Sequence, residues 1–108
     1  MQPAPIDLVM RALADPTRRM VYQRLASEGE ASVAALTSGS GVTQGAVSQH
    51  LKLLKQAGLV AERPEGRHVF YRARPEGLSP LLAWIDAHTV FWRDRFADLR
   101  DLLEDLDE

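Results

Sequence analysis

Residues 42–60 (VTQGAVSQHLKLLKQAGLV) constrain what this chain can fold into more than any other segment. Their apolar side chains recur with the spacing of one helix face: Val47, Leu51 and Leu54. This spacing predicts a helix that packs the apolar face inward. Thr43 stands where an N-cap belongs and Gly58 stands where a helix usually ends, so we expect the helix at about residues 43–57.

The opposite face of this predicted helix is polar. It carries side chains that can form hydrogen bonds with base edges or phosphates: Gln44, Ser48, Gln49, Lys52 and Lys55. Upstream, residues 32–38 predict a short helix capped by Ser32, and residues 38–41 (SGSG) predict a turn. A short helix, a glycine-containing turn and a polar-faced helix form the helix-turn-helix pattern of DNA-binding proteins.

Two further helices are predicted before this motif. The first should run from about Pro5 to Ala14, where apolar residues repeat at helical spacing: Ile6, Val9, Met10 and Leu13. Asp15 and Pro16 suit the N-cap and the first position of the second helix, which should end at Gly29. We expect the second helix to bury a stripe of three residues: Met20, Val21 and Leu25.

After Gly58 the pattern changes from helical to alternating. Residues 59–63 and 68–72 are rich in β-branched and aromatic residues and flank a turn sequence at 64–67, which predicts a β-hairpin. A hairpin that directly follows a DNA-reading helix is called a wing. Three basic side chains should lie at its tip: Arg63, Arg67 and His68.

The last predicted helix is long and apolar along one side. Ser79 and Pro80 should be its N-cap and first residue, and the helix should reach about residue 106, which is ~40 Å at 1.5 Å per residue. A domain of this size cannot cover such a helix alone, so we expect it to pair with a second copy of the chain. With the N-terminal helix, it should form an interface built from Ile6, Val9, Leu81, Ile85, His88, Trp92, Phe96, Leu99 and Leu103.

Length favours a single domain over residues 1–108, and the predicted elements make it mainly α-helical with a small β-hairpin. We expect a winged helix-turn-helix at about 5–75 and the dimerisation helix at 78–106. The chain has no cysteine, which excludes disulfides and thiolate metal sites, and no apolar run approaches the ~20 residues of a membrane span. Residues 1–7 lack the basic and apolar stretches of a signal peptide, so we expect a cytoplasmic location.

The formal net charge of −2 argues against DNA binding at first sight, but the charges are unevenly distributed. Residues 1–75 carry a balance of +4, whereas residues 76–108 carry a balance of −6. The acidic excess therefore lies in the last helix, away from the mildly basic helix-turn-helix. Such an acidic segment weakens long-range steering toward DNA without preventing binding.

Several strings resemble the ArsR family of bacterial winged-helix repressors. They are ALADPTRR at 12–19, AVSQHLKLL at 46–54, AGLV at 57–60 and GRHVFY at 66–71. The resemblance covers about residues 5–75 and implies a homodimer that represses transcription from a pseudo-palindromic operator. Residues 78–85 (LSPLLAWI), followed by Phe91, Trp92 and Arg93, are similar to a branch of the family that lacks the usual metal sites.

The same resemblance bears on metals. Family members that sense soft metals carry a cysteine-containing string, which this chain lacks. Another family site joins Asp-x-His on the last helix to a His-x-x-Glu string that begins eleven residues later and is supplied by the partner copy. Asp86 and His88 match the first half, but the second half falls on Leu99 and Leu102, which cannot bind a metal. We therefore expect no metal site and no cofactor, and the sequence identifies no effector.

The favoured partner is double-stranded DNA. The expected interface residues are Gln44, Gly45, Ser48, Gln49, Lys52, Arg67 and His68. The polar helix residues should contact bases, and Lys52 and Arg67 should contact phosphates; for Arg67 the sequence leaves the minor groove open as the alternative. His50 should be half-buried and bonded to a neighbouring backbone group. For Arg18 and Arg19 the sequence leaves two roles open, a phosphate contact or an ion pair within the fold.

Two other functions compete with DNA binding. A winged-helix module that contacts protein, with its DNA face idle, is the alternative that the acidic overall charge supports. An enzyme is disfavoured, because the sequence holds no phosphate-binding loop, no nucleophile–base set and no complete metal site.

Overall fold

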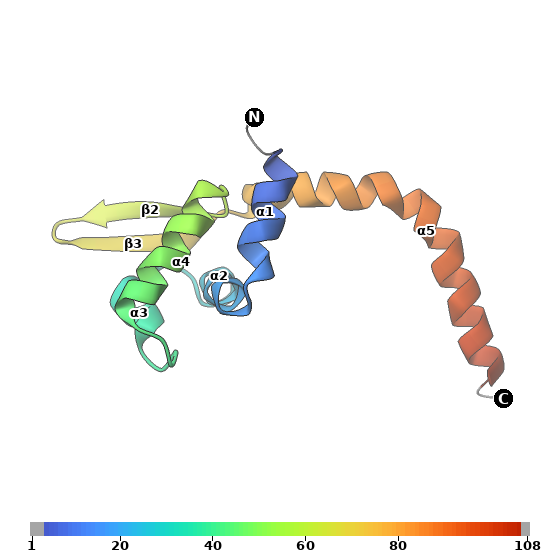
Figure 1. Cartoon of the computed structure of the whole chain (residues 1–108), viewed down its shortest axis with the longest axis horizontal. Helices are drawn as coiled ribbons and strands as arrows, with labels where there is room; N and C mark the ends of the chain where they lie inside the picture. Colours follow the sequence, from blue (N-terminus) through green and yellow to red (C-terminus); the bar gives the residue numbers. More distant parts are fainter. Residues whose placement is uncertain (1–3, 107–108) are drawn as a thin grey trace.

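The computed structural model describes residues 4–106. The start of the segment that lacks signal-peptide features (residues 1–3) and the end of the predicted domain (residues 107–108) lie outside the described residues. In chain order (Figure 1) the elements are α1 (Pro5–Ala14), α2 (Pro16–Glu28), β1 (Ala31–Ser32), α3 (Val33–Thr37), α4 (Gln44–Gln56), β2 (Val60–Glu65), β3 (His68–Ala73), the 3₁₀ helix η1 (Pro75–Leu78) and α5 (Ser79–Leu106).

The predicted hairpin is present and belongs to a three-stranded antiparallel sheet of order β1-β3-β2. Its turn is tighter than predicted, because Pro64 pairs with Val69 inside the hairpin and only Gly66 and Arg67 separate the strands. Proline is tolerated at that position because β2 is an edge strand. The sequence missed β1, a two-residue strand that pairs Ala31 with Tyr71.

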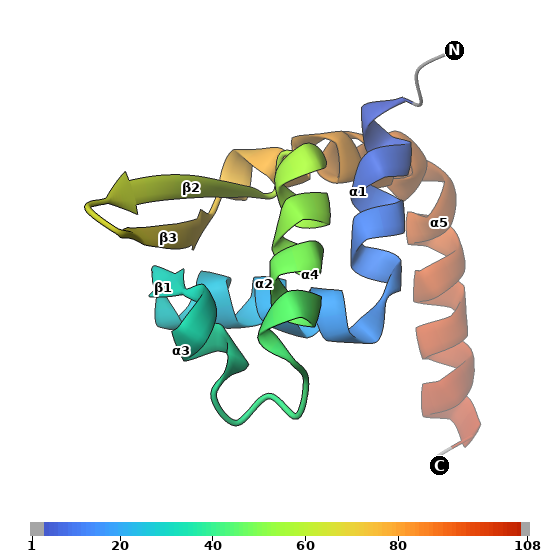
Figure 2. The same ribbon diagram turned by 60° about the vertical axis from the view of Figure 1, so that its left-hand side comes forward.

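The apolar face predicted for α4 is confirmed as the centre of the core. Val47, Leu51 and Leu54 have no exposed surface, and α4 packs across α2 (Figure 2). The buried apolar set is Val9, Ala12, Val21, Tyr22, Leu25, Leu36, Val47, Leu51, Leu54, Leu59 and Val60. Burial of this set is the main source of stability for the helical body.

Two helices are rotated from the predicted orientation. On α2, Met20 is 43% exposed and Tyr22 is buried in its place, so the predicted stripe was wrong at that position. On α1, Met10 is 42% exposed, whereas Val9 is buried inside the protomer. Val9 therefore belongs to the core and cannot contact a second copy, which corrects its assignment to the dimer interface.

Side-chain caps fix the helix starts as predicted at three of four positions. Asp15 accepts a hydrogen bond from the Arg18 backbone N–H at 2.9 Å, and Ser32 and Thr43 cap α3 and α4 in the same way at 3.1 Å. The prediction for Ser79 was wrong. The helix η1 runs directly into α5, so Ser79 has helical backbone angles (φ −57°, ψ −37°) and is not an N-cap.

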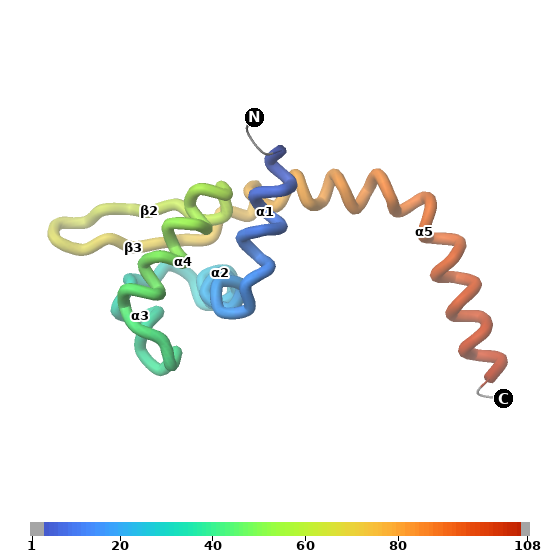
Figure 3. Tube along the Cα trace, in the orientation of Figure 1, coloured from blue at the N-terminus to red at the C-terminus, as the bar shows by residue number. Residues whose placement is uncertain are grey.

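Helix α5 leaves the rest of the domain and bends near its middle (Figure 1 and Figure 3). Only its start packs on the body, where Leu81 is half-buried against the core. The remaining large apolar residues of α5 stay exposed: Leu82, Trp84, Ile85, Val90, Phe91, Trp92, Phe96, Leu99, Leu102, Leu103 and Leu106. No helix within residues 4–106 combines the length and apolarity needed to cross a membrane.

Candidate nucleic-acid interface

The outward face of α4 is available for contact with a partner. The predicted residues on it are all exposed: Gln44, Gly45, Ser48, Gln49 and Lys52. Within residues 4–106, none of their side chains forms a hydrogen bond or ion pair. Lys55, on the same helix, is instead bonded to Glu62 of β2. Lys52 is therefore the α4 lysine that is not already paired within the described chain.

The turn before α4 presents the start of this helix to the outside. Gly39 and Gly41 have left-handed backbone angles (φ +72° and +79°), which glycine adopts without steric penalty. The Ser40 hydroxyl donates a hydrogen bond to the carbonyl of Thr37 at 2.7 Å and so tightens the turn. On α2, Arg24 donates to the Leu36 carbonyl at 3.0 Å, which ties the end of α3 to the helical body.

The wing tip carries two exposed basic side chains, as predicted. Arg67 lies in the turn and His68 is the first residue of β3. In the described part of the chain neither side chain has an ion pair, although the His68 ring lies 6.3 Å from that of Phe70. These two residues therefore remain candidates for contact with a partner.

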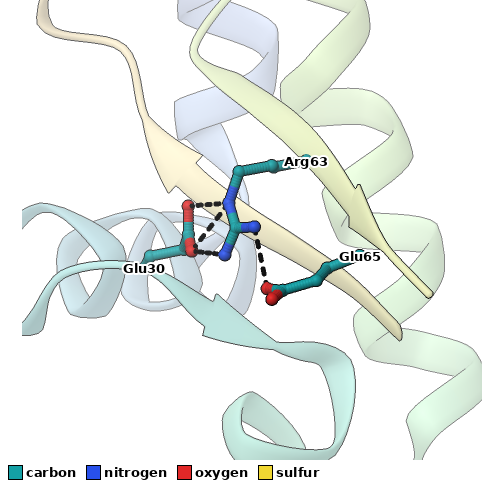
Figure 4. Close-up of polar contacts among 3 residues, drawn as sticks. All are labelled: Glu30, Arg63 and Glu65. Carbon is teal, nitrogen blue, oxygen red and sulfur yellow. Dashed lines mark hydrogen bonds and ion pairs between the residues drawn. The ribbon is translucent and has the colours of Figure 1, made fainter. Parts of the chain in front are cut away.

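Arg63 does not lie free at the wing tip, which corrects the sequence prediction. Its guanidinium is hydrogen-bonded to Glu30, just before β1, and to Glu65 of β2 (Figure 4). It also lies over the Phe70 ring, 5.1 Å from the centroid. Hydrogen bonds from Arg63 hold the pKa of Glu30 below its ordinary value. Arg63 thus anchors the wing to the helical body.

Arg18 and Arg19 form no ion pair within residues 4–106, and a phosphate contact by them stays a prediction. Arg18 donates to the carbonyl oxygens of Ala12 (2.6 Å) and Arg11 (2.9 Å), and Arg19 donates to that of Leu13 (2.6 Å). These are carbonyls of the last turn of α1, which have no partner inside the helix. Both arginines therefore cap the C-terminus of α1, where cations also offset the helix dipole.

His50 is half-buried, as expected, but the predicted backbone hydrogen bond is absent. Its Nδ1 atom is buried and has no hydrogen-bond partner in residues 4–106. His50 lies on α4 between exposed Gln49 and buried Leu51, so it borders the outward face without belonging to it.

Most of the predicted dimer residues lie on exposed surface. Ile6 and Leu81 are half-buried, and Leu81 packs on the core of its own protomer. The others are exposed along α5: Ile85, His88, Trp92, Phe96, Leu99 and Leu103. Several of them line a hollow of about 440 Å³, which also includes Trp84.

The polar groups on α5 include Asp86 and His88, the two residues that match half of the family's metal site. His88 Nδ1 lies 2.7 Å from the carbonyl oxygen of Trp84, and the two rings stack with centroids 4.3 Å apart. Within the part of the chain that the structure describes, no three His, Asp or Glu side chains gather closely enough to hold a metal ion. His88 is thus engaged within its own helix.

Known proteins are similar to this chain in both sequence and fold. A family model described as a helix-turn-helix domain matches residues 13–63. The HTH-type transcriptional regulator Rv2034 of Mycobacterium tuberculosis is 40% identical over 98 residues, which cover 91% of this chain and 88% of that protein.

Solved structures agree with the sequence relatives. A possible transcriptional regulator for arsenical resistance superposes with a TM-score of 0.68 at 39% identity, covering 85% of this chain and 92% of that one. A homodimeric winged helix-turn-helix DNA-binding domain from Mycobacterium bovis, a possible ArsR-family regulator, gives 0.64 at 32% identity, covering 77% and 76%. Together with the exposed polar face of α4 beside a basic wing tip, these similarities show that the chain belongs to the ArsR family of winged helix-turn-helix transcriptional regulators.

Proposed function

We propose that two copies of this chain bind a pseudo-palindromic operator and repress transcription from it. The observation that carries this proposal is the polar face of α4, whose side chains are exposed and unpaired among the described residues. In Figure 2, α4 lies at the front of the domain with the wing beside it, so both can meet one stretch of duplex. A dimer bound at a promoter blocks access by polymerase.

On DNA, α4 lies in the major groove. Gln44, Ser48 and Gln49 contact base edges, and Gly45 allows close approach near the start of the helix. Lys52 from α4 and Arg67 from the wing neutralise phosphates, which makes affinity depend on salt. His68 contacts the backbone beside Arg67. No step in this binding needs a metal or cofactor.

The dimer forms through α5, with α1 beside it. The exposed apolar residues of α5 include Trp92 (44% exposed) and Phe96 (60%), and an apolar surface of this extent is characteristic of an interface. The acidic side chains of α5 lie on the dimerisation side of the protein, remote from DNA. The two-fold axis then places both copies of α4 in successive major grooves, about 34 Å apart.

Selection of bound sites from a random DNA pool tests this function. An inverted repeat with half-site centres about one helical turn apart should be enriched. If the folded protein enriches no sequence, DNA-specific regulation is wrong and the protein-contact alternative takes its place.

A further inference from the structure

Gly77 lies against the backbone at the end of the proposed DNA-reading helix. A Cβ atom added at Gly77 would lie 2.1 Å from the carbonyl oxygen of Gly58 and 3.1 Å from the Cα of Leu59. Ordinary van der Waals contact begins at 3.4 Å, so no other residue fits without a shift of backbone. The φ angle of Gly77 is not in the left-handed region, so close approach is the reason for glycine here.

This contact joins two functional elements through backbone alone. Gly58 (φ +77°) ends α4, and the next amide, that of Leu59, donates to the Leu54 carbonyl at 3.0 Å. The Leu59 carbonyl in turn accepts from the Arg74 amide at 2.8 Å, just before η1. Because η1 continues without a break into α5, the last turn of α4 and the root of α5 form one connected unit.

We propose that Gly77 is a positioning residue that sets the angle between α4 and α5, and with it the separation of the two α4 helices in the dimer. This inference rests on the proposed function. An alanine at Gly77 would force η1 and Gly58 apart by about 1 Å, because packed backbone does not compress. Since α5 extends over 28 residues, of order 40 Å, a small change at its root becomes a displacement of several ångströms across the two-fold axis.

The test compares Gly77→Ala with the parent chain and with Ser79→Ala, a control at an exposed position two residues away. Each protein is measured for dimer mass, for affinity toward the operator selected by the parent chain, and for affinity toward a single half-site. Because the chain has no cysteine, Gln23→Cys on α2 also gives one spin label per protomer, and pulsed EPR reports the separation of the two helical bodies.

Gly77→Ala should remain a dimer, lose at least tenfold in operator affinity and keep half-site affinity within twofold. Its interspin distance should shift by several ångströms, and reselection should enrich half-sites at a different spacing. Ser79→Ala should match the parent chain in every measurement. A folded Gly77→Ala dimer with parental distance and parental spacing would overturn the positioning role.

A second variant tests the proposal if Gly77→Ala does not fold. Insertion of one glycine between Leu78 and Ser79 interrupts the continuous link between η1 and α5 without a clash at Gly58. It should also change the interspin distance and lose operator affinity while keeping half-site binding; an unchanged distance rejects the proposal. A parent chain that selects no DNA, or that is monomeric, instead rejects the proposed function and the positioning role with it.

Discussion

The guanidinium of Arg63 on β2 and the carboxylate of Glu30, beside β1, join two segments that are far apart in sequence. The Arg63 Nε lies 3.1 and 3.2 Å from the two Glu30 oxygens, and a second nitrogen reaches the same carboxylate. This pair holds the wing to the helical body through β2, at the position where Arg63 pairs with Phe70 of β3 (Figure 4). Wing orientation therefore depends on a charge that can be titrated.

Glu30→Gln should lower the free energy of unfolding at neutral pH, and the difference from the parent chain should vanish in acid. Folding lowers the pKa of Glu30, so its stabilisation is present above the ordinary value of 4.5 and is lost as pH falls through the lowered value. Urea unfolding at stepwise lower pH measures this difference. Glu104→Gln on α5 controls for loss of a carboxylate. An equal difference at neutral and acid pH would contradict the prediction.

Gln49→Ala should weaken binding to the selected operator by ~1–3 kcal/mol and relax preference at one base pair in each half-site. The reason is that Gln49 is exposed on the outward face of α4 and unpaired within the described residues. Binding titrations on the operator and its single-base variants provide the measurement. Gln23→Ala on α2 is the matched control. Unchanged affinity and base preference would show that α4 enters the groove differently.

Arg67→Ala should weaken binding to operator and random DNA alike. Each neutralised phosphate contributes about 0.9 to the slope of log affinity against log salt, so the slope should fall by about one to two units per dimer. Titrations at several salt concentrations measure this slope. Lys55→Ala should change it less, because that ammonium is already paired with Glu62. A loss confined to the operator would instead make Arg67 a base-reading residue.

The chain should be a dimer at micromolar concentration, with twice the 12.0 kDa mass of one copy by light scattering. Phe96→Asp should give monomers, because it places a charge in the exposed apolar face of α5. Met20→Asp, at another exposed apolar residue but on α2, should remain dimeric. A parent chain with the 12.0 kDa mass of a monomer would contradict the proposal that two copies bind two half-sites.

Zinc should leave DNA affinity unchanged within error. Asp86 and His88 supply two potential ligands, and in residues 4–106 no third one lies close enough to complete a site. DNA titrations with and without zinc, for the parent chain and for His88→Ala, test this. A tenfold effect of zinc that His88→Ala abolishes would reveal a metal site on α5.

The sequence predicted best those features that depend on local pattern. The three apolar residues of α4 and its Thr43 cap lie within one helix, so spacing and capping rules alone identify them. The exposed aromatic face of α5 follows from the same periodicity. Features set by contact between distant segments were missed or misplaced. Met20 and Tyr22 exchange places because the packing of α2 against its neighbours decides its rotation.

The roles of Arg63 and Gly77 could not be predicted from local sequence for the same reason. Arg63 sits in a hairpin whose composition suits a DNA-contacting tip, and its partner Glu30 lies 33 residues earlier. Gly77 looks like an ordinary helix breaker, and its role comes from the carbonyl of Gly58, which only the folded chain brings close. Neither the contact of Arg63 with Glu30 nor that of Gly77 with Gly58 can be predicted from the spacing of residue types.

The pairing of β1 with β3 has a consequence for the order in which the chain folds. It joins residue 31 to residue 71, so the polypeptide between them must close as a long loop before this ladder can form. The hairpin itself closes over two residues and can form early. We therefore expect the hairpin to nucleate independently and to dock onto Ala31 and Ser32 late, after α3 and α4 have packed. A refolding experiment should then show the sheet completed in the slowest phase.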